Sequence, residues 1–595
     1  MRSICKTISK VGYKISDEKK SYIFYIVIII LVLLHNINVL KDPYFTDEIG
    51  YWAAGALFSG HDWSGAISHL PYYGYGYGIF LAPFFGLHDS VKMFHGAVLL
   101  NIVFVIGTFF NINFILKALF GNLDASKRIM AVFASCMYVS NIVYAHMTLC
   151  EVCLTFFFSL MVRTVCKICI KISFIGIIEL SITLTFLTAI HLRELVFIIA
   201  ALILFLFMIV CKRWKIKYFI CFGLCMVFFM IVVFAVKSYM INNLYTNKET
   251  LSYISYNDDI PTQLSRLKGI FQAEWWVALF RSVIEKLFYL SASSYFIFCF
   301  SVFHIVMFLV NIKTNFDTYY YPIYFFLFIA VLGVILFNGL VAGDTRIDQL
   351  LYGRYMENIM SVFLSIGFAY LSDTRKNIAK DLLSFMAVSL LASVVCYTHM
   401  VNLGFAGEEA EAKVQALQVT GLAGLAGINQ VDKYIGFTIY AILIIIAFSI
   451  VLYFLRRRNW RIFVLGLTVC WIVSGYKGLG DFAYNFNGTQ NRKELTRLQD
   501  YSEVKETADQ IENIRTDKIY YLLEEGVKNS SYYQMYSLQY DLVDLPLTVV
   551  LNDNMDTKLE KGILVVHHSN SIFSEVSSKY ELLYENGKYS IFNVE

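Results

Sequence analysis

The sequence predicts an all-α polytopic membrane protein with about 13 transmembrane helices and a small C-terminal extracytoplasmic α/β domain. Of its 595 residues, 58% are hydrophobic and only 16% are charged. A soluble chain of this size needs more charge to cover its surface. Apolar runs of near twenty residues recur along the chain, and each is long enough to span about 30 Å of hydrocarbon.

The first apolar run begins at Tyr22 and ends at Leu40. It is too long for a cleaved signal peptide, and no small-residue cleavage site follows before Asp42. We therefore expect it to remain as the first membrane span. The predicted spans cover roughly 21–40, 92–116, 128–147, 149–166, 172–190, 195–211, 217–236, 287–311, 321–342, 356–372, 382–400, 435–455 and 461–476.

Lysine and arginine gather in alternate connections between these spans, which places those connections in the cytoplasm by the positive-inside rule. Residues 1–20 are then a cytoplasmic tail, and 21–476 form the transmembrane domain. Four larger segments lie outside: 41–91, 237–286, 401–434 and 477–595. All twelve cysteines lie elsewhere in the chain, as suits a bacterial plasma-membrane protein whose exported parts lack disulfides.

The outer segment 41–91 is rich in glycine and tyrosine. Residues 48–60 have a helical pattern, and a short apolar helix from Ile79 is too brief to span and is expected to lie in the interface. The segment 237–286 is expected to form amphipathic helices on the outer membrane surface.

From about residue 477 the charge rises and the apolar runs shorten to strand length. Residues 501–514 read as an amphipathic helix, and 518–524, 563–568 and 589–594 read as strands. The sequence thus predicts an α/β domain of 477–595. We find no glycine-rich phosphate loop there, and the adjacent His567 and His568 point to opposite faces of a strand, which argues against a joint metal site.

Ionisable residues stand at the outer ends of several predicted spans. Charges near hydrocarbon are costly and usually face a cavity or a partner. Alternatively, each is an ordinary interfacial charge that snorkels to water. The residues are Asp47, Glu48, Glu151, His191, Arg193, Glu194, Asp344, Arg346, Asp348, Arg354 and Glu357.

The chemistry of this set is mixed. Carboxylates can deprotonate a hydroxyl or hold a divalent cation, and arginines can bind a phosphate bidentately. Together they suit a substrate with a phosphate leaving group and a hydroxyl nucleophile. An outward site also needs an energy-rich substrate that is available outside the cell, and a lipid-linked phospho-sugar meets that need.

Five stretches resemble glycosyltransferases of the GT-C fold, a group that includes protein O-mannosyltransferases, the lipid A aminoarabinose transferase and mycobacterial arabinosyltransferases. The resemblance covers roughly the first 375 residues. The stretches are "YFTDEIGYW" (44–52), "HLPYYGYGYGIFLAPFF" (69–85), "MTLCEVCLTFF" (147–157), "HLRELVF" (191–197) and "RIDQLLYGRYMENIM" (346–360).

The resemblance implies a polyprenyl-phosphate sugar as donor and transfer with inversion. It implies Asp47 as general base, with Glu48 and Glu151 positioning the acceptor or the base. It implies that Arg193, Arg346 and Arg354 contact the donor phosphate, with His69 where aminoarabinose transferases have a lysine. The remaining candidate pocket residues are Asp62, Tyr72, Tyr73, Tyr75, His191 and Glu357.

Simpler roles compete at three positions. Asp47 could cap the helix of 48–60, Asp62 could cap a turn, and Arg354 could pair with Glu357 three residues on. Asp47, Glu48 and Asp62 could also hold Mg²⁺ or Ca²⁺. We expect no required cofactor, because many members that use monophosphate donors need no metal.

The leading hypothesis is an integral-membrane glycosyltransferase that modifies a hydroxyl of a surface glycan, glycopolymer or glycolipid. An alternative is a polysaccharide polymerase or ligase that uses lipid-diphosphate oligosaccharides. A lipid-linked-sugar transporter or flippase is disfavoured, because the ionisable residues stand at helix ends and no internal repeat is evident. No nucleic acid partner is expected.

Overall fold

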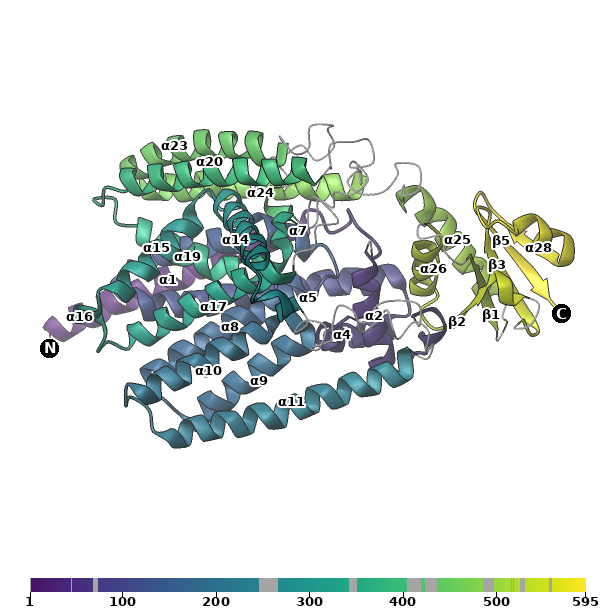
Figure 1. The fold of residues 1–595 in the computed structure, drawn as a ribbon, viewed down its shortest axis with the longest axis horizontal. Coiled ribbons are helices and arrows are strands. Elements are labelled where there is room, and N and C mark those ends of the chain that lie inside the picture. Colours follow the sequence, from purple (N-terminus) through teal and green to yellow (C-terminus); the bar gives the residue numbers. More distant parts are fainter. Residues whose placement is uncertain are drawn as a thin grey trace.

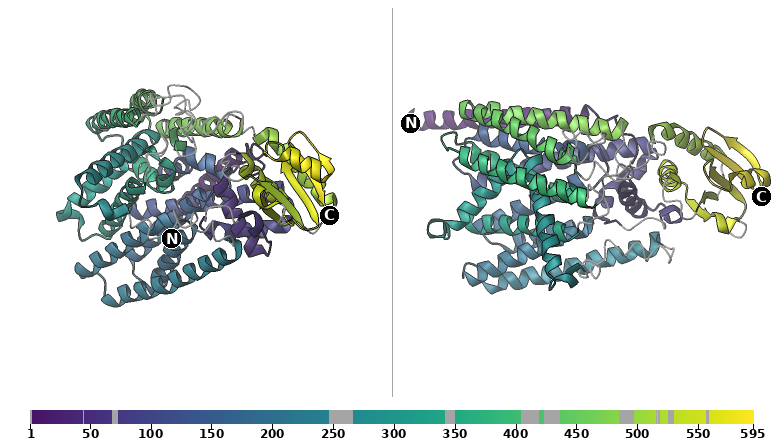
Figure 2. Two further views of the ribbon diagram at one scale, coloured as in Figure 1. Left: turned by 45° about the vertical axis from the view of Figure 1, so that its right-hand side comes forward. Right: turned by 45° about the horizontal axis from the view of Figure 1, so that its top comes forward.

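A computed structural model describes most of the chain. The described residues are 2–43, 45–67, 73–245, 266–341, 350–403, 419–422, 436–484, 497–514, 516, 518–524, 530–555 and 559–595. Long helices form a bundle, and the N-terminus and the C-terminal domain lie at opposite ends of its long axis (Figures 1 and 2).

The bundle is built from consecutive helices joined mostly by short turns. They are α1 (Arg2–Leu34), α5 (Ser90–Leu119), α6 (Ala125–Cys136), α7 (Val139–Ala145), α8 (Glu151–Ile170), α9 (Phe174–Ile190), α10 (Leu195–Val210), α11 (Ile216–Leu244), α14 (Ala273–Ser293), α15 (Ile297–Val310), α17 (Tyr320–Val341), α19 (Met360–Leu371), α20 (Ala379–Asn402), α23 (Ala441–Arg458) and α24 (Trp460–Tyr484).

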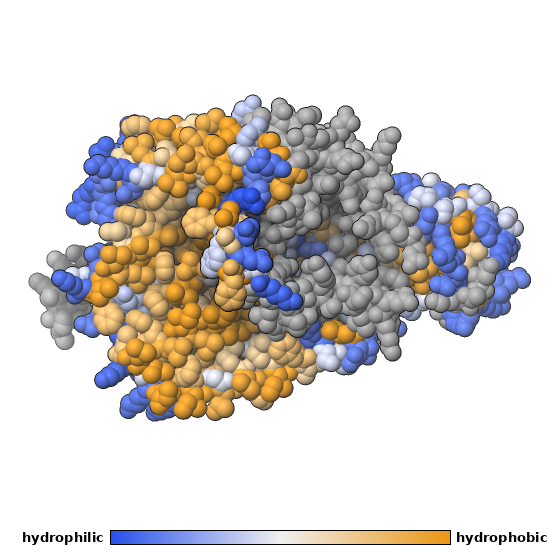
Figure 3. All heavy atoms as spheres, in the orientation of Figure 1, coloured by the Kyte–Doolittle hydropathy of each residue, from blue (hydrophilic) through white to orange (hydrophobic). Residues whose placement is uncertain are grey.

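The bundle has the character of a multi-pass membrane protein. Within the described residues, 8 helices are long and apolar enough to cross a membrane, or up to 10 if each bent helix pair counts as one span. This count does not reach the predicted thirteen, partly because α9 has 17 residues and α19 has 12. Apolar side chains cover much of the bundle's visible side, and hydrophilic ones gather at its end and on the C-terminal domain (Figure 3).

The predicted single span 287–311 is wrong. The chain there forms α14 and α15, which are bent by 114° at a short break. Tyr295 and Phe296 hold left-handed backbone angles, with φ of 51° and 64°. Aromatic residues seldom adopt this conformation. No glycine or proline stands at this point of the sequence, so the break could not be predicted from it.

The other outer segments are described only in part. α11 continues as far as Leu244 and α14 begins at Ala273. Within 237–286, where amphipathic helices are predicted, the described residues form the end of α11, the 3-10 helix η3 (Arg266–Gly269) and the first part of α14, and 246–265 lie outside the described residues. Most of 401–434 lies outside them as well.

The first outer segment folds into short helices. They are α2 (Thr46–Ser59), α3 (Ser64–Ile67), α4 (Gly76–Leu81) and the 3-10 helix η1 (Ala82–Leu87). The expected helix over 48–60 and the short helix near Ile79 are both present. α2 and α4 cross closely: a Cβ atom at Gly78 would come within 2.8 Å of the Tyr51 carbonyl oxygen.

The C-terminal domain is a five-stranded sheet with helices. The three strands expected from the sequence are present, and the two missed strands, β2 and β4, are the sheet edges in the order β2-β1-β3-β5-β4. β1 pairs in parallel with β2 and β3, whereas β5 pairs antiparallel with β3 and β4. The elements are α25 (Arg497–Ile514), β1 (Ile519–Leu523), α26 (Ser530–Asp541), β2 (Leu547–Leu551), β3 (Gly562–His567), α28 (Phe573–Lys579), β4 (Glu581–Glu585) and β5 (Tyr589–Val594).

This domain packs on the segment 41–91 through the end of α26 and the turn that follows it. We call this contact, between Trp63 and Ser90 on one side and residues 540–544 on the other, the seam. The Trp63 indole N–H donates to the Val543 carbonyl (3.2 Å), and the Tyr540 hydroxyl donates to the Ser90 carbonyl (3.0 Å). The Ser90 hydroxyl donates to Asp541. One hydrophobic core runs continuously from the bundle through this seam to one face of the sheet, so the domain is fixed to the bundle rather than tethered to it.

The seam leaves no room at Gly65 of α3. A Cβ atom there would lie 2.4 Å from the Leu547 carbonyl oxygen. We expect Gly65→Ala to cost about 1–3 kcal/mol of stability through overpacking, and to speed proteolysis of the C-terminal domain. Thermal unfolding in detergent and limited proteolysis measure this. Gly86→Ala is the control, because its Cβ would meet nothing within 4 Å, and equal behaviour of the two variants would contradict the packing.

Candidate functional site

The candidate site lies where four helices begin, at the end of the bundle that faces the C-terminal domain. Asp47 stands in the first turn of α2, and Glu151 is the first residue of α8. Carboxylates are favoured at these positions, because the helix N-terminus carries a partial positive charge. Arg193 lies in the 3-10 turn η2 (Leu192–Glu194) before α10, and Arg354 lies in the 3-10 turn η4 (Gly353–Ile359) before α19.

Arg354 joins two of the predicted acids. Its Nη1 lies 2.8 Å from Asp47 Oδ2, and its Nε donates to Glu151 Oε1. The guanidinium is buried and so is Glu151, whose side chain is 2% exposed. The Asp47 side chain is 27% exposed. Asp47 is therefore the acid of this pair that a substrate can reach.

Arg193 forms the second cationic centre. Its Nε donates to Glu194 Oε1 at 3.0 Å, and its Nη2 lies 3.9 Å from Glu151 Oε1. The guanidinium stacks 4.2 Å from the Tyr355 ring centroid. Both Nη atoms are buried, and within the described residues neither donates a hydrogen bond. An oxyanion beside them would meet donors with unused capacity.

Asn358, which is not among the predicted site residues, helps to hold this centre. Asn358 donates to both oxygens of Glu194, at 3.1 and 2.9 Å, which fixes the carboxylate that pairs with Arg193. His191 lies beside them, and its Nδ1 accepts from the Arg193 backbone N–H at 3.3 Å. Burial and the neighbouring Arg193 and Arg354 hold the pKa of His191 well below its ordinary range, so its imidazole is neutral at pH 7.

Glu48 does not face this cluster. It is fully buried, and its Oε2 accepts from both the backbone N–H (2.6 Å) and the hydroxyl (2.7 Å) of Thr148, in the turn before α8. Its Oε1 accepts from the Phe45 N–H at 3.1 Å. Glu48 therefore ties the start of α2 to the start of α8, which sets Asp47 and Glu151 at a fixed separation.

The structure also decides between the predicted site roles of Asp47 and Arg354 and the simpler roles proposed for them. α2 begins at Thr46 with Phe45 as its N-cap residue, so Asp47 lies inside the first turn and is not the cap. Arg354 pairs with Asp47 and Glu151 rather than with Glu357. Glu357 instead accepts from the Tyr289 hydroxyl and from the Gly421 N–H.

The remaining candidates are spread more widely. Asp62 is exposed and accepts from the Ser64 N–H (3.0 Å) and hydroxyl (2.7 Å), which caps a turn just before α3. Tyr73 packs beside Gly50 of α2, and the Tyr75 hydroxyl donates to the Val233 carbonyl of α11. Asp47, Glu48 and Asp62 therefore do not converge as metal ligands. His69, Tyr72 and Arg346 lie outside the described residues.

The chain is similar to known proteins in structure and not in sequence. No family model matches the chain, and no curated protein matches it. ArnT from Cupriavidus metallidurans, solved with undecaprenyl phosphate bound, is similar with a TM-score of 0.53 and 10% identity. The match covers 96% of this chain and 97% of that chain. The apo structure of ArnT gives a TM-score of 0.51 and 12% identity.

The predicted fold is thus confirmed: the chain has the GT-C fold of ArnT. The match also runs beyond the first 375 residues that the sequence motifs cover, and it includes most of the C-terminal part. Such low identity shows the fold and leaves the chemistry to be argued from the residues themselves.

We expect Glu48→Gln to destabilise the protein. The amide NH₂ cannot accept, so buried donors at Phe45 or Thr148 lose their partner, at a cost of about 1–3 kcal/mol. Thermal unfolding of purified protein measures the change. Asp62→Asn is the control, because asparagine also caps a turn. A Glu48→Gln protein as stable as the control would contradict the clamp.

We expect Arg354→Gln to cost about 3–5 kcal/mol, because buried Glu151 loses the nearer of its two arginine partners and keeps only Arg193 at 3.9 Å. Adding Glu151→Gln should recover part of that loss, and unfolding curves of the four proteins give the coupling energy. Arg375→Gln, which removes an exposed ion pair with Asp373, should leave stability unchanged. Strict additivity of the two site variants would disprove the buried pair.

Proposed function

We propose that this protein is a membrane glycosyltransferase. It transfers a sugar from a polyprenyl-phosphate donor to a hydroxyl of a cell-surface glycan, glycopolymer or glycolipid. Support comes from the GT-C fold shared with ArnT, which was solved with undecaprenyl phosphate. Further support comes from the acid and arginine cluster at the helix starts.

The observation that carries the proposal is the setting of Asp47. Its Oδ2 is held by Arg354 at 2.8 Å, and among the described residues no hydrogen bond reaches Oδ1. A general base needs such an oxygen within reach of the acceptor hydroxyl. Glu151 and Glu194 are both buried and held by arginines, so they orient the cations and do not meet the acceptor.

The reaction then proceeds as a single displacement. Asp47 accepts the proton of the acceptor hydroxyl while that oxygen attacks the anomeric carbon from the face opposite the phosphate. The bond between the anomeric carbon and the phosphate oxygen breaks, polyprenyl phosphate leaves, and the configuration inverts. Arg354 keeps Asp47 aimed at the acceptor, because the guanidinium is itself fixed by Glu151.

The leaving phosphate requires positive charge. Arg193 supplies it, since its two Nη groups retain donor capacity in a buried setting where charge interactions are strong. Arg354 borders the same space. Arg346 and His69 are further candidates for this contact, and Tyr72, Tyr73 and Tyr75 are candidates for the wall of the donor pocket.

No cofactor is needed for this displacement. Mg²⁺ or Ca²⁺ at Asp47 would have to draw its other ligands from elsewhere, because Glu48 is engaged by Thr148 and Asp62 by Ser64. We place the cluster and the C-terminal domain outside the bacterial plasma membrane and the N-terminus inside. The lysine and arginine bias supports this orientation, and the two termini lie at opposite ends of the bundle (Figure 1).

We expect Asp47→Asn to reduce transfer about 10²–10⁴-fold without loss of folding. The assay uses purified protein in lipid, a panel of radiolabelled polyprenyl-monophosphate sugars, and a crude cell-envelope acceptor. Asp124→Asn is the matched control, because Asp124 caps α6 and asparagine caps a helix equally well.

Each alternative result has a definite meaning. Full activity in Asp47→Asn would disprove the assigned base. Label that moves only from diphosphate-linked oligosaccharides would identify a polymerase or ligase. Label that crosses the bilayer without forming a bond would identify a flippase.

A further inference from the structure

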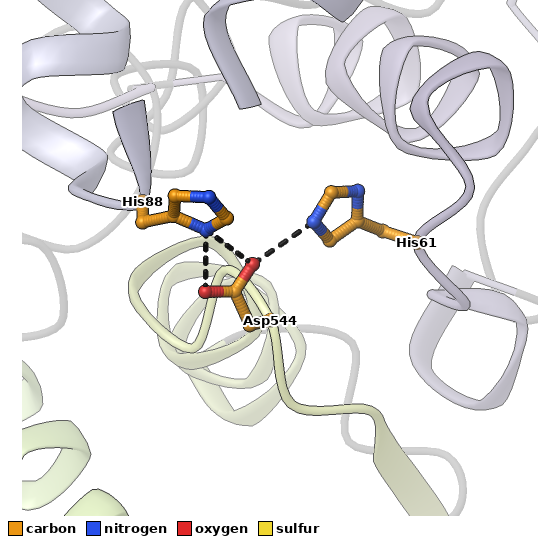
Figure 4. Close-up of side chains that lie close together, drawn as sticks. All are labelled: His61, His88 and Asp544. Atoms are coloured by element: carbon orange, nitrogen blue, oxygen red, sulfur yellow. Dashed lines mark hydrogen bonds and ion pairs between the residues drawn. The ribbon is translucent and has the colours of Figure 1, made fainter. Parts of the chain in front are cut away.

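Three potential metal ligands meet at the seam between the first outer segment and the C-terminal domain (Figure 4). His61 follows α2, His88 follows η1, and Asp544 lies in the turn between α26 and β2. His61 Nε2 lies 2.9 Å from Asp544 Oδ1, and His88 Nδ1 lies 2.8 Å from Asp544 Oδ2. All three ligand atoms fall within 4.8 Å of one another.

The hydrogen bonds of His61 indicate which of its nitrogens bears a proton. The Ser59 hydroxyl donates its one hydrogen to the carbonyls of Gly55 and Ala56, both at 2.9 Å. Ser59 Oγ therefore accepts from His61 Nδ1, which lies 3.0 Å away. In a neutral imidazole this leaves a lone pair on Nε2, aimed at a carboxylate oxygen.

A lone pair and a carboxylate oxygen at 2.9 Å repel each other unless a cation lies between them. That cation is either a second proton on His61 or a metal ion. His88 Nδ1 reaches the same carboxylate, where it either donates a proton as a neutral imidazole or presents a lone pair to a shared metal ion. A single dication satisfies two neutral imidazoles and one carboxylate at once.

We propose that His61, His88 and Asp544 bind a zinc ion that fastens the C-terminal domain to the first outer segment. Imidazole nitrogen with carboxylate oxygen is a donor set that suits Zn²⁺, whereas Mg²⁺ and Ca²⁺ prefer oxygen alone. Tetrahedral zinc with bonds of about 2.0–2.1 Å places its ligands about 3.3 Å apart. Each histidine–carboxylate contact would therefore lengthen by a few tenths of an ångström.

The ligands are accessible and already positioned. Their side chains are 19%, 62% and 49% exposed for His61, His88 and Asp544, which leaves a path for the ion and room for a water as fourth ligand. The Ser59 contact orients His61, as a second hydrogen bond usually does for a metal-binding histidine. Next to Asp544, the Trp63 bond to Val543 fixes the turn.

The zinc site is a structural fastening rather than part of the reaction centre. His61 comes two residues after the end of α2, and the first turn of α2 carries Asp47. The ion would thus hold the far end of this helix against the C-terminal domain. This assignment does not depend on the proposed transfer reaction.

The test uses the full-length protein in detergent, purified with a tag that contains no histidine. The protein is stripped with a chelator and titrated with ZnSO₄, and bound zinc is measured by elemental analysis. We expect one zinc per chain, and its loss in His61→Gln, His88→Gln and Asp544→Asn. His568→Gln is the control, because it removes a histidine from the same domain away from the seam and should retain the zinc.

A second readout separates binding from folding. His88 is the most exposed ligand, so His88→Gln should fold as the wild type does without metal. Zinc should raise the unfolding temperature and slow proteolysis at the seam in the wild type and in His568→Gln, and change neither in His88→Gln. Zinc uptake by the wild type no greater than by the His61→Gln/His88→Gln double variant would overturn the proposal in favour of protonated histidines.

Discussion

The arrangement of the site depends on one buried cation. Arg354 joins Asp47 on α2 to Glu151 on α8, although 307 residues separate Arg354 from Asp47. A buried charge without a partner is very costly, so these three helix starts are stable only when they meet. The same requirement confines Arg193, Glu194 and Asn358 to the adjoining space. A buried ion network of this kind supplies positional accuracy more than stability, and the proposed displacement would depend on that accuracy.

Adjacent acids in the sequence have opposite surroundings in the fold. Successive helical residues point about 100° apart, so adjacent acids on α2 can meet different surroundings. Glu48 is fully buried against Thr148, while Asp47 remains partly exposed. The doublet thus combines a clamp with a reachable carboxylate, and the clamp keeps the reachable carboxylate in place.

Local sequence patterns made the broad fold predictable, whereas contacts between residues far apart in the sequence could not be predicted. Apolar runs and charge bias predicted the membrane bundle, and short apolar runs of strand length predicted β1, β3 and β5, the three inner strands of the sheet. The edge strands β2 and β4 were missed, and nothing in the aromatic pair Tyr295–Phe296 marked the sharp bend between α14 and α15. The predicted topology placed Asp47, Glu151, Arg193 and Arg354 on one side of the membrane. No feature of the sequence indicated that Thr148 would bind Glu48.

The seam has a consequence for the order in which the protein is made. The ribosome makes Trp63 480 residues before its partner Val543, and it makes Ser90 well before Asp541. At a synthesis rate of about 5–20 residues per second, roughly 20–100 seconds separate these partners. During that interval every membrane helix can insert while α2 and α3 lack their covering domain. The helix that carries Asp47 therefore gains its cover only after Val543 has been made, so the nascent chain is a membrane protein well before α2 and α3 reach their final packing.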